Sequence, residues 1–257
     1  MKNIKFFVIH NRDPLRKKVI LDELNKNGVA NKDIQFVEFP NKEELTYGIK
    51  KIAVQKRRNR HNYNDENLKG KSIKDGWICV SYKHYLALEA IVKNNFEFSV
   101  IVEDNVGKFN KNILETLNTC MEQLPSDWDV VFDSTRAHSY EFIGEGKVSK
   151  DCIVYEKSLN YTFNEYGKIV SAGGTKSAQF YFLNYNSAKK LYENYLPFNH
   201  APDVWMNELF RFLNFKTFWI EPSITENRKN HTSSTNFSKK ISLYKVKSKL
   251  TNFILSI

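Results

Sequence analysis

The chain has no apolar stretch near the roughly 20 residues that a membrane-spanning helix requires. Its start, MKNIKFFVIHNRD, has only a short apolar run before a charged turn. We therefore expect neither a transmembrane helix nor a signal peptide. Cysteine is also scarce, with Cys79, Cys120 and Cys152 as the three present, and no two of them stand at C-x-x-C spacing. An odd, scattered set excludes a disulfide framework and a zinc knuckle, and favours a reducing, cytoplasmic compartment.

Hydrophobic residues make up 41% of the 257 residues and charged residues 26%, a balance typical of globular proteins and not of disordered ones. Lys and Arg number 39 against 29 Asp and Glu, which gives a formal net charge of +10. Such an excess favours a polyanionic partner, which can be a nucleic acid, a membrane surface or a phosphorylated small molecule. Charge alone does not choose among these three.

The hydrophobic pattern predicts an alternation of strands and helices. The apolar run at 4–9 predicts a buried strand, and Pro14 begins a helical pattern that Gly28 ends before a second strand at 34–39. Further helices are predicted at 78–95, 112–124, 187–195 and 203–213, and further strands at 99–102, 129–132, 178–183 and 216–220. This order predicts an α/β protein with a wound, mostly parallel sheet.

Two segments stand apart from this pattern because they are polar and basic. Residues 55–76 carry no apolar periodicity, and we expect a long surface loop there. From residue 231 the chain is rich in Ser, Thr, Asn and Lys and ends in a basic amphipathic segment. We therefore expect one compact domain at 1–230 and a basic tail at 231–257.

A short polar sequence, Glu103-Asp104-Asn105, follows the predicted strand at 99–102. Ligands of open α/β sheets bind beyond the carboxyl ends of the strands, so the position favours a site. Hard oxygen ligands such as these can hold Mg²⁺ or Mn²⁺, which in turn neutralises a diphosphate. A solvated turn explains the same residues equally well, because Asp and Asn are common in turns.

The order of several motifs resembles the bacterial lipopolysaccharide glycosyltransferases of family 25 and the related collagen galactosyltransferases. The opening FFVIHNRDPLRKK is similar to their first strand, Arg- and Pro-containing turn and basic helix. The stretch VSYKHYLALEAIVKNNFEFSVIVEDNV resembles their helix with a Ser-His pair and their strand ending in Leu-Glu-Asp-Asp. Lys83 stands where the family has Ser, His84 matches its His, and Asn105 replaces its last Asp. The block GGTKSAQFYFLNYNSAKKLYENYLPFNHAPDVWMNELF and a later EPSIT before HTSS complete the resemblance.

This resemblance implies a GT-A-like fold, Rossmann-like and built for nucleotide-diphosphate sugars, with a mixed, mostly parallel sheet in a single domain. It implies transfer of a hexose, galactose or glucose, from a UDP-sugar to an acceptor hydroxyl on a glycan, a lipopolysaccharide or a protein. The acceptor can be lipid-linked. Divalent metal, Mn²⁺ or Mg²⁺, is the implied cofactor. The basic loop and tail are expected to make a peripheral contact with the inner face of a membrane.

Site residues follow from the same resemblance. The implied metal ligands are Glu103, Asp104, Asn105 and His231. The implied donor contacts are His10, Asn11, Arg12, His84, Asp104, Gly174 and Thr175. An inverting transfer also needs a carboxylate that takes the acceptor proton, and Asp203 is the residue we expect in that role. Asp203 can instead be a helix N-cap, the turn at 10–12 an ordinary polar turn, and His231 a solvated side chain.

Asp133, at the end of the predicted strand at 129–132, can face the same cleft, although a structural carboxylate is the favoured interpretation. Two rival functions remain. A degenerate, sugar-binding protein of the same fold is favoured by the change at Asn105. A nucleic-acid-binding protein is favoured by the net charge and the basic cluster at 56–60, but no RRM, KH or zinc-finger signature accompanies them. We therefore expect no nucleic-acid partner.

Overall fold

The computed structural model describes residues 3–53, 73–109, 112–133, 153–156, 161–163, 169–171, 177–221 and 223–227. Its strands are β1 (Ile4–Ile9), β2 (Ile34–Val37), β3 (Phe98–Glu103), β4 (Val106–Phe109), β5 (Val130–Asp133), β6 (Ile153–Glu156), β7 (Tyr161–Phe163), β8 (Ile169–Ser171), β9 (Phe180–Asn184), β10 (Thr217–Glu221) and β11 (Thr225–Asn227). Its helices are α1 (Pro14–Lys26), α2 (Tyr47–Ala53), α3 (Asp75–Lys93), α4 (Ile113–Gln123), α6 (Tyr185–Tyr195) and α7 (Pro202–Phe212), with 3₁₀ turns η1 (Asn31–Asp33) and η2 (Lys42–Glu44).

Seven strands form the central sheet in the order β2-β1-β3-β9-β5-β10-β6. The pairs β2-β1, β1-β3 and β5-β10 are parallel, whereas β9 is antiparallel to both of its neighbours and β6 is antiparallel to β10. Five of the seven strands therefore run in one direction. This confirms the α/β class and the mixed, mostly parallel sheet that the resemblance implies.

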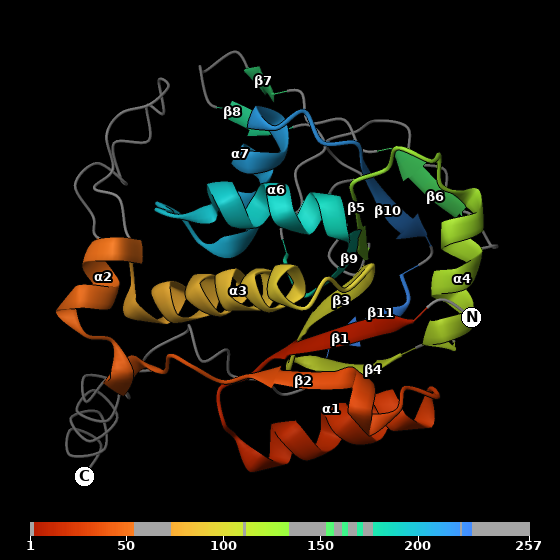
Figure 1. Cartoon of the computed structure of the whole chain (residues 1–257), viewed down its shortest axis with the longest axis horizontal. Helices are drawn as coiled ribbons and strands as arrows, with labels where there is room; N and C mark the ends of the chain where they lie inside the picture. Colours follow the sequence, from red (N-terminus) through yellow and green to blue (C-terminus); the bar gives the residue numbers. More distant parts are fainter. Residues whose placement is uncertain are drawn as a thin grey trace, which may run out of the picture.

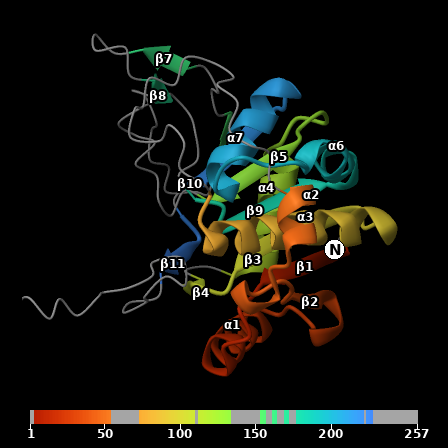
Figure 2. The same ribbon diagram turned by 90° about the vertical axis from the view of Figure 1, so that its left-hand side faces the viewer.

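Helices cover both faces of this sheet (Figure 1). Side chains of β1 alternate between the two faces, because successive residues of a strand point in opposite directions. Phe7 and Ile9 belong to a buried cluster with residues of α3, α6 and α7. Phe6 and Val8 belong to a second cluster with residues of α1 and α4. The sheet therefore lies between two layers of helices, with one buried cluster on each of its faces. Figure 2 shows these three layers from the side.

Local signals explain where several elements begin. The Asp13 side chain accepts hydrogen bonds from backbone N–H groups in the first turn of α1, and Pro14 occupies the first helical position. Asn112 caps α4 in the same way. Gly28 ends the α1 segment with a φ of 83°, the left-handed region that favours glycine.

Two sequence predictions differ from the structure in this region. Helix α3 begins at Asp75, so the polar loop predicted to reach residue 76 ends earlier. The strands β4 and β11 were not predicted, since each is short and pairs only with the other, across 116 or more residues of chain. Residues 55–72 of the predicted loop lie outside the described part of the chain, as does the tail at 231–257.

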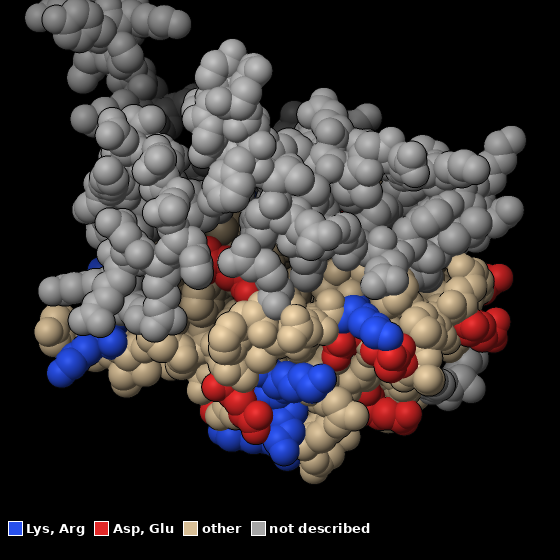
Figure 3. All heavy atoms as spheres, turned by 90° about the horizontal axis from the view of Figure 1, so that it is seen from above, with Lys and Arg blue, Asp and Glu red and all other residues tan. Residues whose placement is uncertain are grey.

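One face of the described residues carries charges of both signs (Figure 3). Seen from above, Lys and Arg side chains lie among Asp and Glu side chains (Figure 3). Within the described ranges, no helix has the length and apolar character needed to cross a membrane.

Candidate functional site

The turn after β1 (residues 10–12, the β1 turn) and the acidic trio after β3 (residues 103–105) lie side by side. The parallel register pairs Ile9 with Glu103. The backbone N–H of Asp104 also donates to the carbonyl of Ile9 at 3.1 Å. Both segments therefore share the carboxyl-end edge of the sheet, where ligands of open α/β sheets bind.

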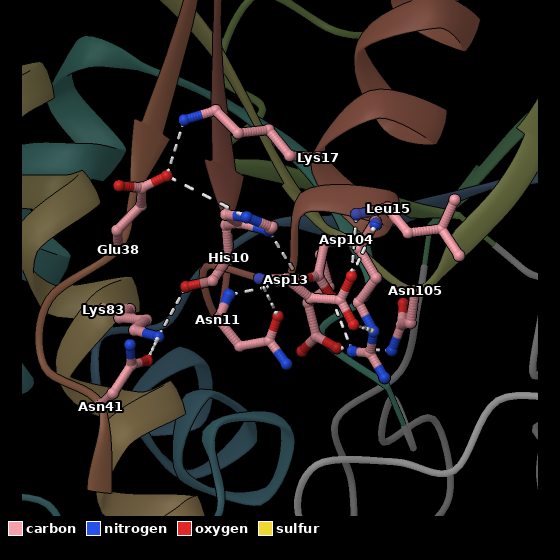
Figure 4. A network of polar contacts seen from close by, with 12 residues as sticks. His10, Asn11, Asp13, Leu15, Lys17, Glu38, Asn41, Lys83, Asp104 and Asn105 are labelled. Atoms are coloured by element: carbon pink, nitrogen blue, oxygen red, sulfur yellow. Dashed lines mark hydrogen bonds and ion pairs between the residues drawn. The ribbon is translucent and has the colours of Figure 1, made fainter. Parts of the chain in front are cut away.

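Asp104 is a buried carboxylate with three donors around it (Figure 4). Its Oδ2 accepts from the Nδ1 position of His10 at 2.8 Å and from the backbone N–H of Asn11 at 3.3 Å. Its Oδ1 accepts from Nη1 of Arg16 at 3.1 Å. Burial by itself would raise the pKa of Asp104, but the hydrogen bond from His10 and the positive charge of Arg16 outweigh it and hold that pKa below its ordinary value.

The rest of the β1 turn is held locally. Arg12 has a φ of 66°, in the left-handed region that non-glycine residues seldom adopt. Its exposed guanidinium donates to Oε1 of Glu44 at 2.9 Å. The Asn11 side chain accepts from the backbone N–H of Asp13 at 3.2 Å. The turn is therefore a fixed shape with a cationic side chain on its outside.

The side chain of Lys83, in α3, also contacts the β1 turn. Its Nζ donates to the carbonyl oxygen of His10 at 2.6 Å and to Oδ1 of Asn41 at 2.8 Å. The side chain is buried, and burial lowers the pKa of its ammonium group. The lysine that replaces the family's Ser therefore fastens the chain after β1 and the chain after β2 to α3.

Glu103 lies on the other side of the trio, between an amide and a histidine. Its Oε2 accepts from Nδ2 of Asn105 at 2.9 Å, and its Oε1 lies 3.6 Å from Nε2 of His84. The other ring nitrogen of His84 is 2.9 Å from the hydroxyl of Tyr181, and both of those side chains are fully buried. His84 is thus held in place by Tyr181 with one edge directed at Glu103.

Asp203 comes from α7, far along the chain, yet it is electrostatically coupled to this cluster. Burial and the negative charge of Glu103 raise the pKa of Asp203 to about 6, against the opposing effects of the Val204 N–H and of His84. Burial raises the pKa of the Tyr195 phenol, and the negative charges of Asp203 and Glu103 raise it further. A carboxyl group with a pKa near 6 is suited to accept a proton near neutral pH.

The alternative interpretation of Asp203 as an N-cap is wrong. Helix α7 begins at Pro202, so Asp203 already lies inside its first turn. Its Oδ1 accepts only from the adjacent backbone N–H of Val204, at 2.9 Å, among the hydrogen bonds of the described residues.

The trio was expected to hold a divalent ion with all three side chains, and its geometry favours two of them. Both oxygens of Asp104 already accept hydrogen bonds, one of them from a guanidinium. By contrast, Oδ1 of Asn105 is buried without a hydrogen-bond partner, beside the Glu103 carboxylate. Glu103 and Asn105 therefore fit a hard cation. No group of three or more His, Cys, Asp or Glu side chains in the described ranges is arranged to hold a metal.

Asp133 has the structural role that the sequence favoured. Its Oδ1 accepts from the backbone N–H of Ile224 at 2.9 Å. Its Oδ2 accepts from Ser223 Oγ at 3.0 Å and from both the N–H and the hydroxyl of Thr225. These bonds fix the chain between β10 and β11.

Three other predicted site residues, Gly174, Thr175 and His231, lie outside the described residues. Conversely, the structure brings in Arg16 and Tyr181, which sequence reasoning did not assign to the site. Arg16 sits at a buried position of the basic helix, which charge alone did not single out. Tyr181 lies in a buried strand, where an aromatic residue is expected for packing alone.

The sequence matches the model of glycosyltransferase family 25, described as an LPS biosynthesis protein, over residues 3–206. This range includes the β1 turn, the acidic trio, His84 and Asp203. No curated protein matches the chain by sequence.

Several solved structures have a similar outline at low sequence identity. A 4-diphosphocytidyl-2C-methyl-D-erythritolsynthase from Anaerococcus prevotii is 12% identical, with 97% of this chain and 99% of that chain covered and a TM-score of 0.44. A glycosyltransferase involved in glycosylation of the major capsid of PBCV-1 is 9% identical, with coverages of 89% and 94% and a TM-score of 0.45. A CMP:2-keto-3-deoxy-manno-octonic acid synthetase complexed with CTP is 10% identical, with coverages of 98% and 99% and a TM-score of 0.43.

Proposed function

The chain belongs to glycosyltransferase family 25, and from this premise we propose that it transfers a hexose from a UDP-sugar to an acceptor hydroxyl with inversion. The observation that carries the proposal is that the β1 turn and the acidic trio lie side by side at the carboxyl-end edge of the sheet, and that the charges of Glu103 and of His84 in α3 act on Asp203. A carboxylate that can take a proton near neutral pH then lies by the edge where a nucleotide sugar would bind.

In the proposed reaction, the Asp203 carboxylate takes the proton of the acceptor hydroxyl. The acceptor oxygen forms a bond to the anomeric carbon as the bond from that carbon to the diphosphate oxygen breaks. UDP leaves with the electron pair of the broken bond, on the face of the sugar opposite to the acceptor. The acceptor oxygen is a poor nucleophile until its proton is removed, so the base lowers the barrier to transfer.

The donor would lie across the carboxyl-end edge, with its nucleotide against the β1 turn of His10, Asn11 and Arg12. Glu103 and Asn105 would hold a divalent ion, Mn²⁺ or Mg²⁺. Such an ion supplies positive charge that stabilises the diphosphate leaving group. His84 acts in this proposal by fixing the Glu103 carboxylate. Gly174, Thr175 and His231 stay predictions from the family resemblance.

The acceptor is a hydroxyl of a glycan, a lipid-linked glycan such as a lipopolysaccharide, or a protein. A peripheral contact with a membrane through residues 56–60 and the tail is part of this proposal, because basic clusters bind anionic surfaces. We propose no nucleic-acid partner, because the sequence carries no RRM, KH or zinc-finger signature.

The test is a panel of UDP-sugars, with CMP- and GDP-sugars for comparison, incubated with the full chain, Mn²⁺ and a mixed glycan acceptor set. We expect release of UDP that depends on the acceptor, and NMR of the product should show an inverted anomeric centre. Asp203→Asn serves as the matched inactive control. UDP-sugar binding without transfer to any acceptor would indicate the degenerate, sugar-binding alternative. A retained anomeric configuration would contradict the role of Asp203.

A further inference from the structure

His10 is held at both of its ends by buried charged side chains from two different elements. Asp104, after β3, accepts from the imidazole at 2.8 Å. Lys83, in α3, donates to the backbone carbonyl of the same residue at 2.6 Å. The exposed fractions of His10, Asp104 and Lys83 are 1%, 6% and 3%. Figure 4 shows the three side chains converging on the start of the β1 turn.

Asp104 and Lys83 each make a second hydrogen bond besides the one to His10. Asp104 accepts from the backbone N–H of Asn11 at 3.3 Å, so it fixes the next peptide of the turn. Lys83 donates to the Asn41 side chain at 2.8 Å, which ties the turn to the chain after β2. The turn that we propose as the nucleotide contact therefore has its imidazole, its carbonyl and one of its N–H groups fixed.

The burial of these charged groups costs desolvation free energy, so stability alone does not explain the arrangement. A buried ammonium group loses its hydration, and the two acceptors that the structure gives Lys83 are a carbonyl and an amide oxygen, both neutral. A buried ion pair can often be replaced as a whole by apolar groups with little loss of stability. What these buried charges supply is a single defined geometry, which is the requirement of a binding turn.

We propose that Asp104 and Lys83 are positioning residues that clamp the β1 turn in its nucleotide-binding shape, and that Asp104 is not a metal ligand. The inference rests on the proposed function, since the turn is taken to contact the donor nucleotide. Glu103 and Asn105 then account for the gain in UDP affinity on adding a divalent ion. The UDP affinity that remains without the ion depends on the clamp formed by Asp104 and Lys83.

The test uses the full chain and four variants, Asp104→Asn, Lys83→Met, Asp129→Asn and Lys93→Met. Asp129 is a matched control because it is a buried carboxylate that accepts from Ser187 and from the Lys216 N–H at the amino end of β5. Lys93 is the matched control for Lys83, because it lies on the same helix with its charge exposed and paired to Glu89. The affinity for UDP is measured by calorimetry, once with Mn²⁺ and once with a chelator, well below the melting temperature of each variant.

We expect Asp104→Asn and Lys83→Met each to weaken UDP binding at least about tenfold in both conditions, the size of effect that loss of a charge-assisted hydrogen bond gives. The ratio of the affinities with and without Mn²⁺ should stay at the wild-type value. Asp129→Asn should lower the melting temperature and leave UDP affinity unchanged, and Lys93→Met should change neither. Normal affinity with the chelator but loss of the Mn²⁺ gain in Asp104→Asn would show that Asp104 is a metal ligand and would overturn the proposal.

Hydrogen exchange of the β1 turn in the absence of nucleotide provides the second measurement. The amides of residues 10–12 should exchange faster in Asp104→Asn and in Lys83→Met than in the wild type and in the two controls. Unchanged exchange in both variants would show that no clamp exists. If the wild type binds no UDP in either condition, the proposed donor is wrong, and the exchange rates still decide whether the clamp holds the turn.

Discussion

Nε2 of His84 lies 3.6 Å from Oε1 of Glu103, and Nδ1 of the same ring lies 2.9 Å from the Tyr181 hydroxyl. The His84 ring therefore lies between the phenol of Tyr181 and the carboxylate of Glu103. The Asn105 amide donates to the second oxygen of Glu103 at 2.9 Å. Both carboxylate oxygens of Glu103 are therefore held in place, as is expected of a side chain that binds a cation at a fixed position.

Glu103→Gln should abolish the gain in UDP affinity that Mn²⁺ provides. The substitution removes the anionic oxygens and leaves a neutral amide of nearly the same shape, a weak ligand for a hard cation. Calorimetric titration of UDP with and without Mn²⁺ measures the gain. A Glu103→Gln variant that keeps the full gain would place the ion elsewhere, and affinity in the chelator should stay near the wild-type value.

Asp203→Asn should slow transfer at least about a hundredfold, as expected for loss of a general base. The amide keeps the size of the side chain but does not take a proton. Circular dichroism and UDP affinity should match the wild type, because Asp203 contacts neither the β1 turn nor Glu103 by a hydrogen bond in the described structure. Transfer at a near-normal rate would remove Asp203 from the mechanism.

The rate of transfer should rise with pH and reach half of its maximum near the pKa of Asp203, about 6. Only the ionised carboxylate accepts a proton, so activity is lost as the pH falls below this value. A pH series of kcat/KM tests it, because kcat/KM reports the pKa values of the free enzyme. The ascending limb should be absent in Asp203→Asn; a midpoint that persists in that variant would belong to another group.

The same group makes a predictable contribution to stability. The pKa of Asp203 in the folded state is raised above its ordinary value of 3.8. The folded protein therefore binds a proton more tightly than the unfolded chain does, and this contribution is fully present below pH 3.8 and is lost as the pH rises through about 6. Urea unfolding should show Asp203→Asn gaining stability relative to the wild type between pH 4 and pH 8. An unchanged difference between the two proteins across this range would contradict the raised pKa.

Asp133→Asn should destabilise the fold by about 1–3 kcal/mol, because an amide nitrogen then faces backbone N–H donors that are left unpaired. The free energy of unfolding in urea measures this loss. Below its melting temperature the variant should keep the wild-type kcat, in contrast with Asp203→Asn. A hundredfold loss of kcat with normal stability would instead identify Asp133 as the base.

Neutralising Lys56, Arg57, Arg58 and Arg60 together should raise the KM for an anionic acceptor and leave UDP-sugar hydrolysis unchanged. These residues lie outside the described structure, and the expectation follows from their charge. Steady-state kinetics at two salt concentrations test it, because an electrostatic contribution weakens with ionic strength. An equal loss of hydrolysis would point to donor binding or folding.

The sequence by itself predicted the elements whose signals are local. The apolar run of β1 and the helical pattern that Pro14 begins and Gly28 ends act within a few residues, so they are visible without the fold. The order of family motifs also led to the acidic trio, His84 and Asp203. Cysteine spacing and the lack of long apolar runs also led us to expect neither a disulfide framework nor a membrane-spanning helix.

Only the tertiary structure decided which partners these residues have. Asp104 meets His10 across 94 residues of sequence and Arg16 across 88, and Lys83 meets the His10 carbonyl across 73. No local pattern encodes such contacts, because they depend on strand register and on how α1 and α3 pack against the sheet. For the same reason, the sequence did not distinguish the roles of the three residues of the acidic trio. In the structure Asp104 is held by hydrogen bonds on both carboxylate oxygens, whereas Glu103 and Asn105 present oxygen atoms that fit a cation. Burial is the physical reason, because a buried charge is unfavourable unless it is paired or hydrogen-bonded. The partner that a buried side chain has in the fold therefore determines its role.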